Sequence, residues 1–458
     1  MIGPGRSSPR VTFVAIAVAV AFADSSIVVL ALPDLYGRFD ATIAGIAWVI
    51  TSYNLALALG GLALVRAGDR IRADAALAAG SLVFLVASIA CALAGSLPVL
   101  VAARAVQGLG GALLLAGALL ALGDAAGSTP RGLAIWTVTG TFGVALGPAL
   151  GGALTQLFDW RAIFVMQAPV AAGALSAAIG VRRGSLGGSS AGEAGERSAL
   201  LRVLPANLCL ALVFGALVGA LFLGVLLVVD VFRSPPIEGA AVVTAIPIAA
   251  LLAQPLALRL PGALDVVAGA LLLAAGLLAL ALLPSSALGY AVGAFALSGL
   301  GLGLCVPGLT AAALTDGAAT GRLGALTVGI RHLGLVVALV AVAPLLAGDL
   351  SEAADVASLN GAAVVIDGRI PATTKIPLAL DIRDAIDRAP KGEVPDFTDV
   401  FEEHGAGADA AVRVVRDELT DAIELAMVRG FRGSFVVCSA LAALAAVAAT
   451  AFRRWIVR

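Results

Sequence analysis

Two ionisable residues stand deep inside long apolar runs of this 458-residue chain, and they are the first candidates for chemistry. Asp24 lies 8 residues before the end of the run 11–32, and Arg104 lies about 7 residues after the start of the run 97–122. Because each residue of a helix adds the same rise, the two lie at a matched depth and can interact if their helices are neighbours. A carboxylate beside a guanidinium stays ionised, whereas one buried alone favours its protonated form, so an Asp that moves between these environments can carry a proton. The alternative is a static pair that only orients two helices.

Glycines crowd a second apolar segment, "GTFGVALGPALGGALTQLFDWRAIF" at 140–164, although each interior glycine costs a soluble helix about 0.5–1 kcal/mol relative to alanine. Gly143, Gly147 and Gly151 recur every four residues and therefore share one helix face. In lipid, such small residues let two helix backbones approach closely. Pro148 bends the helix and frees backbone groups that neighbours must satisfy. The segment predicts a tight helix crossing, either static or sliding.

The composition is that of a membrane protein: 60% of the residues are hydrophobic, 13% are charged, and the mean hydropathy is +1.03. A helix needs about 20 apolar residues to cross a bilayer. The sequence therefore predicts an all-α polytopic membrane protein with about twelve transmembrane helices. The first run is expected to remain as a helix, with a cleaved signal peptide as the alternative. The expected spans are 11–32, 43–65, 75–95, 97–122, 133–157, 162–181, 203–229, 238–258, 263–283, 287–314, 322–346 and 432–452. Arg331, near one end of the eleventh span, is expected to extend its side chain to the interface or to bond to carbonyl oxygens.

Arginines in the short loops predict the orientation. The short loops on one side hold only Arg38, Arg161 and Arg233, whereas those on the other side hold most of the remaining arginines. Since positive charge gathers in the cytoplasm, both termini are expected there, in a multi-pass protein of the plasma (inner) membrane.

The spans divide into two halves. A shift of 191 residues places Gly108 on Gly299 and Arg131 on Arg322, which indicates an internal repeat of six plus six helices. The expected domains are an N-terminal half (1–181), a cytoplasmic linker (182–202), five helices of the C-terminal half (203–346), an extracytoplasmic insertion (347–431), and the last helix with its tail (432–458).

The insertion is acidic and partly helical. From Asp349 to Arg432 there are 17 acidic and 9 basic residues. Helical spacing of apolar residues predicts helices at 377–389 and 409–431. Three roles are open for the insertion. Its acidic surface only keeps the domain solvated, or the insertion gates the outer mouth, or it binds an extracytoplasmic partner.

Motifs of other function classes are missing from the sequence. A P-loop needs Lys followed by Ser or Thr, and neither Lys375 nor Lys391 has such a neighbour. His332 and His404 stand alone, so we expect no metal and no cofactor. A formal net charge of -1 argues against nucleic acid as a partner. The chain is not expected to be an enzyme.

Four motifs resemble those of the drug:proton antiporter branch of the major facilitator superfamily. They are "ADSSIVVLALP" (23–33), "RAVQGLGGA" (104–112), the glycine-rich run around Pro148, and "DWRAIF" (159–164) followed by Pro169. The loop between the second and third spans keeps Asp69 and Arg70 of that family's gating loop.

The resemblance implies a major facilitator fold and a role for each motif. Asp24 and Arg104 would serve proton coupling, and Asp69 and Arg70 would act in cytoplasmic gating. The fourth-span motif would comprise Gln107, Gly108 and Gly110. The interface that favours export would comprise Gly140, Gly143, Gly147, Pro148, Gly151 and Gly152.

Three functions follow as hypotheses. The first is a secondary active transporter, a monomeric proton-coupled exporter of small lipophilic compounds working by alternating access. The second is an exporter of lipids or cell-envelope precursors that uses the insertion. The third is a membrane receptor or scaffold that has this fold and transports nothing.

Overall fold

The computed structural model describes residues 9–179, 181, 185, 186, 193–257, 259, 260, 263–284, 287–314, 320–388, 397–404 and 409–453. In these ranges the chain is helical, apart from loops and one isolated antiparallel bridge between Arg72 and Ser185. Eleven of the described helices are long and apolar enough to cross a membrane, and a bent helix brings the number to as many as twelve. This agrees with the expected twelve spans.

The N-terminal half contains six long helical spans, the first of which is built from three consecutive segments. These segments are α1 (Pro9–Ile27), η1 (Val28–Ala31) and α2 (Leu32–Phe39). The other spans are α3 (Ile43–Ala67), α4 (Ala73–Ala92), α5 (Leu97–Ala125), α6 (Thr129–Leu157) and α7 (Arg161–Ala178), with the short η2 (Gly68–Arg70) between α3 and α4.

The C-terminal half begins with α8 (Glu193–Val218), which continues through two π-helical turns, η3 (Gly219–Leu223) and η4 (Leu227–Val231), on either side of α9 (Gly224–Leu226). The remaining helices of this half are α10 (Pro236–Val243), α11 (Ala245–Ala257), α12 (Leu264–Ala281), α13 (Leu288–Leu314), α14 (Thr320–Asp367) and α18 (Arg432–Ala451).

Two helices run across boundaries expected from the sequence. Helix α8 begins at Glu193, inside the stretch 182–202 expected to be a linker, because Glu, Ala, Arg and Leu are good helix formers. Helix α14 continues through 346/347 as far as Asp367, so the eleventh span leads into the insertion without a break.

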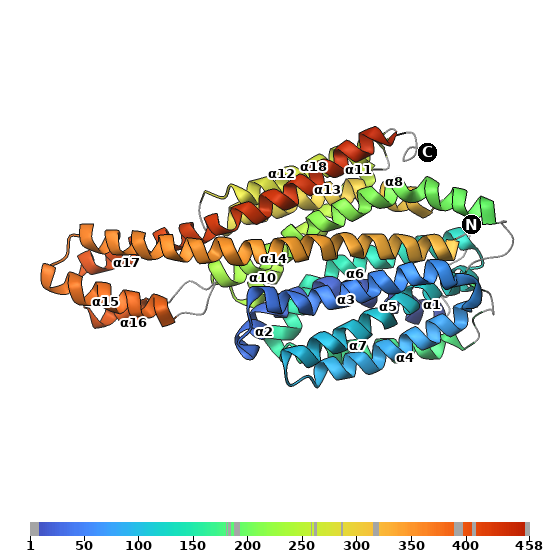
Figure 1. Cartoon of the computed structure of the whole chain (residues 1–458), viewed down its shortest axis with the longest axis horizontal. Helices are drawn as coiled ribbons and strands as arrows, with labels where there is room; N and C mark the ends of the chain where they lie inside the picture. Colours follow the sequence, from blue (N-terminus) through green and yellow to red (C-terminus); the bar gives the residue numbers. More distant parts are fainter. Residues whose placement is uncertain are drawn as a thin grey trace.

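The insertion is a helical projection at one end of the bundle, while both chain termini lie at the other end (Figure 1). It consists of the end of α14, α15 (Ala372–Arg388), α16 (Thr398–Glu403) and α17 (Ala410–Gly430). Val365, Ile382, Phe401 and Leu419 are buried in it, and they belong to the apolar core that continues from the bundle. We call the two ends of the bundle the terminal end and the insertion end.

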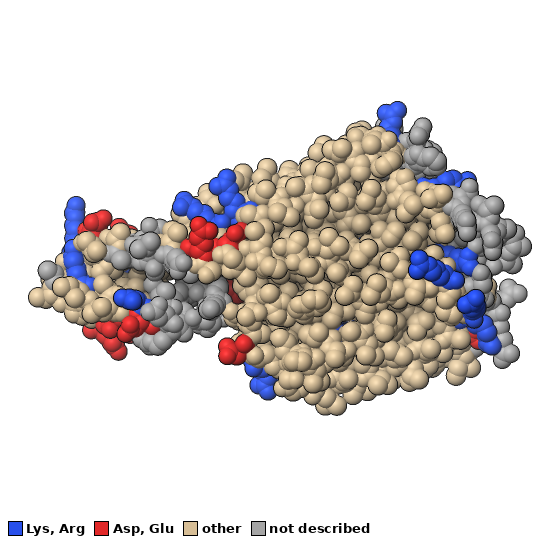
Figure 2. All heavy atoms as spheres, in the orientation of Figure 1, with Lys and Arg blue, Asp and Glu red and all other residues tan. Residues whose placement is uncertain are grey.

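Charge separates the bundle from the insertion (Figure 2). In this view the flank of the bundle is almost free of charged side chains, and Lys and Arg gather at the terminal end. Acidic and basic side chains both appear on the insertion and where it joins the bundle. An uncharged belt between charged ends is the surface that a bilayer requires.

Candidate functional site

The structure brings Asp24 of α1 and Arg104 of α5 together as a buried ion pair. The Oδ2 atom of Asp24 accepts a hydrogen bond from Nη1 of Arg104, and both side chains are fully buried. Arg104 also donates from Nε to the carbonyl oxygen of Val49 over 3.0 Å. The contact expected from the matched depth of the two residues is therefore present, and the pair has no net formal charge.

Two amides extend this pair into a polar network. Nε2 of Gln167, on α7, donates to Oδ1 of Asp24. Gln107 accepts from Arg104 Nη1 over 2.7 Å, and its Nε2 donates to Gln167 over 2.6 Å and to the Ser88 hydroxyl over 2.9 Å. All of these side chains are fully buried. Because a buried polar group without a partner is costly, the network explains how the membrane core accommodates two charges.

Aromatic rings enclose the pair. Cζ of Arg104 lies 4.3 Å from the centre of the Tyr53 ring and 5.7 Å from that of Phe164. The Tyr53 hydroxyl donates to the carbonyl oxygen of Ala21 over 2.8 Å, which ties α3 to α1. These cation–π contacts add to the stabilisation of the guanidinium in a site without water access.

The glycine face of α6 lies against α1. A Cβ atom on Gly143 would overlap the carbonyl group of Ala19, and one on Gly151 would overlap that of Ile27. A Cβ on Gly140 would lie 2.6 Å from the Phe22 ring. Gly152 is buried on the same helix. The glycines therefore allow α6 to approach α1 more closely than any other residue type permits.

Pro148 leaves a backbone carbonyl that α1 satisfies. Because proline has no N–H, the oxygen of Val144 lacks its usual intrahelical donor. The Ser26 hydroxyl lies 3.1 Å from that oxygen and 3.0 Å from the carbonyl oxygen of Ala23. Helix α6 bends by 43° between Val144 and Leu146. The donor for the carbonyl oxygen that Pro148 leaves free is thus Ser26, two residues from Asp24.

The fourth-span motif places α5 against two helices. A Cβ on Gly108 would overlap the Tyr53 carbonyl group of α3, and one on Gly110 would lie 2.6 Å from the Phe84 nitrogen of α4. Gly80 of α4 fits equally tightly, since its Cβ would overlap the Leu114 nitrogen. These glycines hold α3 and α4 close to the helix that carries Arg104.

The loop between α3 and α4, expected to act as a gate, lies next to a backbone hydrogen bond with the chain after α7. Arg70 is exposed, and the side chain of Asp69 lies outside the described residues. Next to them, the Ile71 carbonyl oxygen accepts from the Leu186 nitrogen over 3.0 Å. The same short stretch lies close to α14, because a Cβ on Gly321 would overlap the Leu186 carbonyl oxygen.

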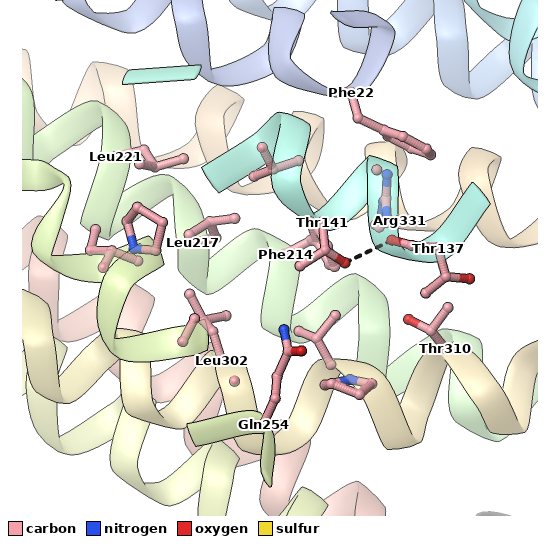
Figure 3. Close-up of a pocket in the computed structure, with 18 of the residues that line it drawn as sticks. Phe22, Thr137, Thr141, Phe214, Leu217, Leu221, Gln254, Leu302, Thr310 and Arg331 are labelled. Carbon is pink, nitrogen blue, oxygen red and sulfur yellow. Dashed lines mark hydrogen bonds between the residues drawn. The ribbon is translucent and has the colours of Figure 1, made fainter. Parts of the chain in front are cut away.

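A cavity of about 100 Å³ lies between the two halves (Figure 3). Its walls come from α1 and α6 on one side and from α8, α11, α13 and α14 on the other. Most of the lining is apolar or aromatic, and it contains no acidic side chain among the residues that the structure describes. The residues that line the cavity include Phe22, Trp136, Gly140, Thr141, Pro148, Phe214, Leu217, Gln254, Leu302, Thr310 and Arg331.

Arg331 corrects an expectation from the sequence. Its position near one end of the eleventh span suggested a side chain that reaches the interface or bonds to carbonyl oxygens. Instead, its guanidinium carbon lies 4.2 Å from the Phe22 ring centre and 4.5 Å from that of Phe214, on the cavity wall. Which way a helical side chain faces depends on helix rotation, and hydropathy does not report that rotation.

Sequence reasoning also missed Gln167 and Ser88. Gln167 is an amide in the middle of an apolar span, which is the signal that singled out Asp24. Applied to amides as well as charges, the same reasoning would have selected it.

The fold and the buried polar network define a polytopic helical membrane protein. A family model described as Major Facilitator Superfamily matches residues 14–339. The chain belongs to the major facilitator superfamily.

Curated relatives match over about a third of this chain. The "Multidrug resistance protein Stp" of Mycobacterium tuberculosis is 36% identical over 154 residues, which cover 33% of this chain and 29% of that protein. The "Tetracenomycin C resistance and export protein" of Streptomyces glaucescens is 34% identical over 177 residues, or 38% and 33% of the two chains. The chain thus spans about three-tenths of the length of these relatives.

Solved structures share the fold at low identity. A bacterial homologue of the human lysosomal transporter Spinster, in an inward-facing and occupied conformation, superposes with a TM-score of 0.66 at 16% identity, covering 97% of this chain and 96% of that one. A D-xylose-proton symporter superposes with a TM-score of 0.58 at 15% identity, covering 74% and 90%.

Proposed function

We propose that this protein is a proton-coupled exporter of small lipophilic compounds that works by alternating access. The observation that carries the proposal is the fully buried ion pair of Asp24 and Arg104, which holds α1, a helix whose Phe22 lines an apolar cavity between the halves. A titratable group in the membrane core is costly and is retained mainly for function. The names of the relatives, which refer to multidrug resistance and export, support this proposal.

Helix α1 connects the two sites. Protonation of Asp24 removes the charge that attracts Arg104, and so weakens the attachment of α1 to α5. Phe22, two residues away on α1, lines the cavity. A movement of α1 therefore changes the substrate site. Because α1 belongs to both sites, protonation of Asp24 and binding of substrate can affect each other through this helix.

Helix α6 provides the surface along which this movement occurs. Its glycine face meets the α1 backbone directly at Ala19 and Ile27, and other residues of α6, including Thr141 and Pro148, line the cavity. We therefore propose that α1 and α6 slide along the glycine face when the cavity opens first to one side of the membrane and then to the other. In this role, Asp69 and Arg70 belong to the gate at the terminal end.

We place both termini in the cytoplasm and the insertion outside the plasma membrane. The gathering of Lys and Arg at the terminal end supports this orientation (Figure 2). Export then moves substrate from the cavity toward the insertion end, while protons move inward through Asp24.

Proton flux in proteoliposomes tests the proposal. The purified protein is reconstituted with a pH-sensitive dye inside and challenged with a panel of lipophilic compounds and lipids. At least one small compound should evoke proton movement in the wild type and none with Asp24→Asn. No flux with any compound would contradict the proposal and favour the receptor or scaffold. Flux with lipids alone would favour the lipid exporter.

A further inference from the structure

The cavity wall carries a cation without an anionic partner. The guanidinium of Arg331 lies between the rings of Phe22 and Phe214, at 4.2 and 4.5 Å from their centres. Its Nε atom is buried and makes no hydrogen bond to any residue in the described ranges. Within the described part of the chain, no carboxylate forms an ion pair with Arg331, whereas Arg104 is paired with Asp24.

Two aromatic rings compensate this charge only in part. Cation–π contacts stabilise the positive charge of the guanidinium, but they supply no acceptor for its N–H donors, which point outward in the plane of the guanidinium itself. Arg331 is only partly buried, but a charge inside a membrane span without an anionic partner is costly, and such residues mark ligand or ion sites. The missing acceptor can come from a ligand in the cavity, because Arg331 lines it.

We propose that Arg331 binds the anionic group of an amphiphilic substrate, so that the exported compounds are lipophilic organic anions, with a carboxylate as the simplest case. This inference rests on the proposed export function. It names the class of compound that the same cavity takes.

The rest of the cavity fits the body of such a molecule. Trp136, Leu217 and Leu302 offer apolar and aromatic surface, and the Phe22 and Trp136 rings meet edge to face with centres 5.0 Å apart. Figure 3 shows Thr141, Gln254 and Thr310 among the side chains around the cavity, where they can accept or donate hydrogen bonds. None of the described residues that line the cavity is acidic, so none of them would attract a cationic compound or compete with a bound anion.

Equilibrium binding to the purified full-length protein separates charge recognition from transport. The probes are 1-naphthoate, neutral 1-naphthamide and cationic 1-naphthylmethylammonium, which share one ring system. Decanoate and decanamide form a second pair, which distinguishes a fatty acid from an aromatic acid. The variants are Arg331→Gln and Arg331→Lys. Arg161→Gln is the matched control, because Arg161 also stacks on a ring, with its Cζ 4.4 Å from the centre of Trp160, but does not line the cavity.

The wild type should bind at least one acid about tenfold or more tightly than its amide, as expected for one hydrogen bond to a charged group. Arg331→Gln should abolish this preference and leave amide binding intact, which also shows that the variant is folded. Arg331→Lys and Arg161→Gln should keep the preference.

Equal binding of acid, amide and ammonium by the wild type would overturn the inference without the need for any variant. An unchanged acid preference in Arg331→Gln would overturn it as well. Neither result affects the outcome of the proton-flux experiment with Asp24→Asn. If that experiment fails, the proposed export function is wrong, while anion binding by Arg331 can still be observed.

Discussion

The two halves of the molecule share their close helix contacts but not their charged chemistry. A shift of 191 residues relates Gly143 to Gly334, and a Cβ on either glycine would overlap an alanine carbonyl group, that of Ala19 or Ala211. The same shift relates Gly110 to Gly301, and each of these meets the backbone of a neighbouring helix. The repeat is therefore one of packing.

The charged residues inside the membrane spans differ between the halves, although Arg131 and Arg322 at the loops correspond. The shift that superposes the glycines places Asp24 on Gly215 and Arg104 on Phe295. Phe295 is fully buried, and a Cβ on Gly224 would lie 2.6 Å from its ring. Conversely, Arg331 of the C-terminal half falls on Gly140, and both line the cavity. We infer that the N-terminal half handles the proton and that the C-terminal half contributes the cation of the substrate site.

The largest effect is expected from breaking the ion pair. Asp24→Asn should abolish transport against a gradient, since the side chain no longer titrates. It also leaves Arg104 without its counter-charge, which should cost about 3–5 kcal/mol of stability. The double variant Asp24→Asn with Arg104→Gln should recover stability in thermal unfolding but not uphill transport, since the two residues act as a coupled pair.

Phe295→Leu is the control in the other half. It should lower stability and leave proton-driven transport in place. Uphill transport by Asp24→Asn at the wild-type rate, with the same pH dependence, would put the proton site elsewhere and end the proposed division between the halves.

A glycine pair tests the shared packing. Gly143→Ala and Gly334→Ala should each destabilise the protein by about 1–3 kcal/mol, because the added Cβ overlaps a backbone carbonyl that cannot move alone. Thermal unfolding in detergent measures this. Gly293→Ala is the matched control, since Gly293 is exposed and its Cβ would meet nothing within 4 Å. A harmless Gly334→Ala beside a harmful Gly143→Ala would show that the halves do not pack alike.

Removal of an amide should have a smaller effect. Gln167→Leu takes away the hydrogen bond to Asp24 Oδ1 and leaves the ion pair intact, at a cost of about 1–3 kcal/mol. Transport should continue, with a pH profile displaced from that of the wild type. An identical pH profile would assign Gln167 to structure alone.

The insertion is expected to matter least for transport. Trypsin added outside intact cells should cut within 347–431, because the proposed topology places this region outside, and the transport rate should stay unchanged. Protection of the insertion together with cleavage in 182–202 would invert the topology and reverse the direction assigned to the proton.

The amino-acid sequence by itself determined the class of fold. Spans of about 20 apolar residues, arginine placement and glycine spacing are local features, and the bilayer imposes them on each helix separately. For this reason α3 begins at Ile43 and α5 at Leu97, as expected. Asp24 and Arg104 could be paired in advance because their equal depth follows from the rise of a helix.

Only the tertiary structure decided which side chains meet across helices. The contact of Gln167 with Asp24, the place of Arg331 between two rings, and the serine that satisfies the carbonyl oxygen freed by Pro148 all depend on how each helix is rotated and which helix lies next to it. The hydropathy of a fully apolar helix is nearly the same on every face, so it carries no information on that rotation. The close backbone contacts that the glycines permit fix the rotation of each helix, and this rotation decides which side chains form the site.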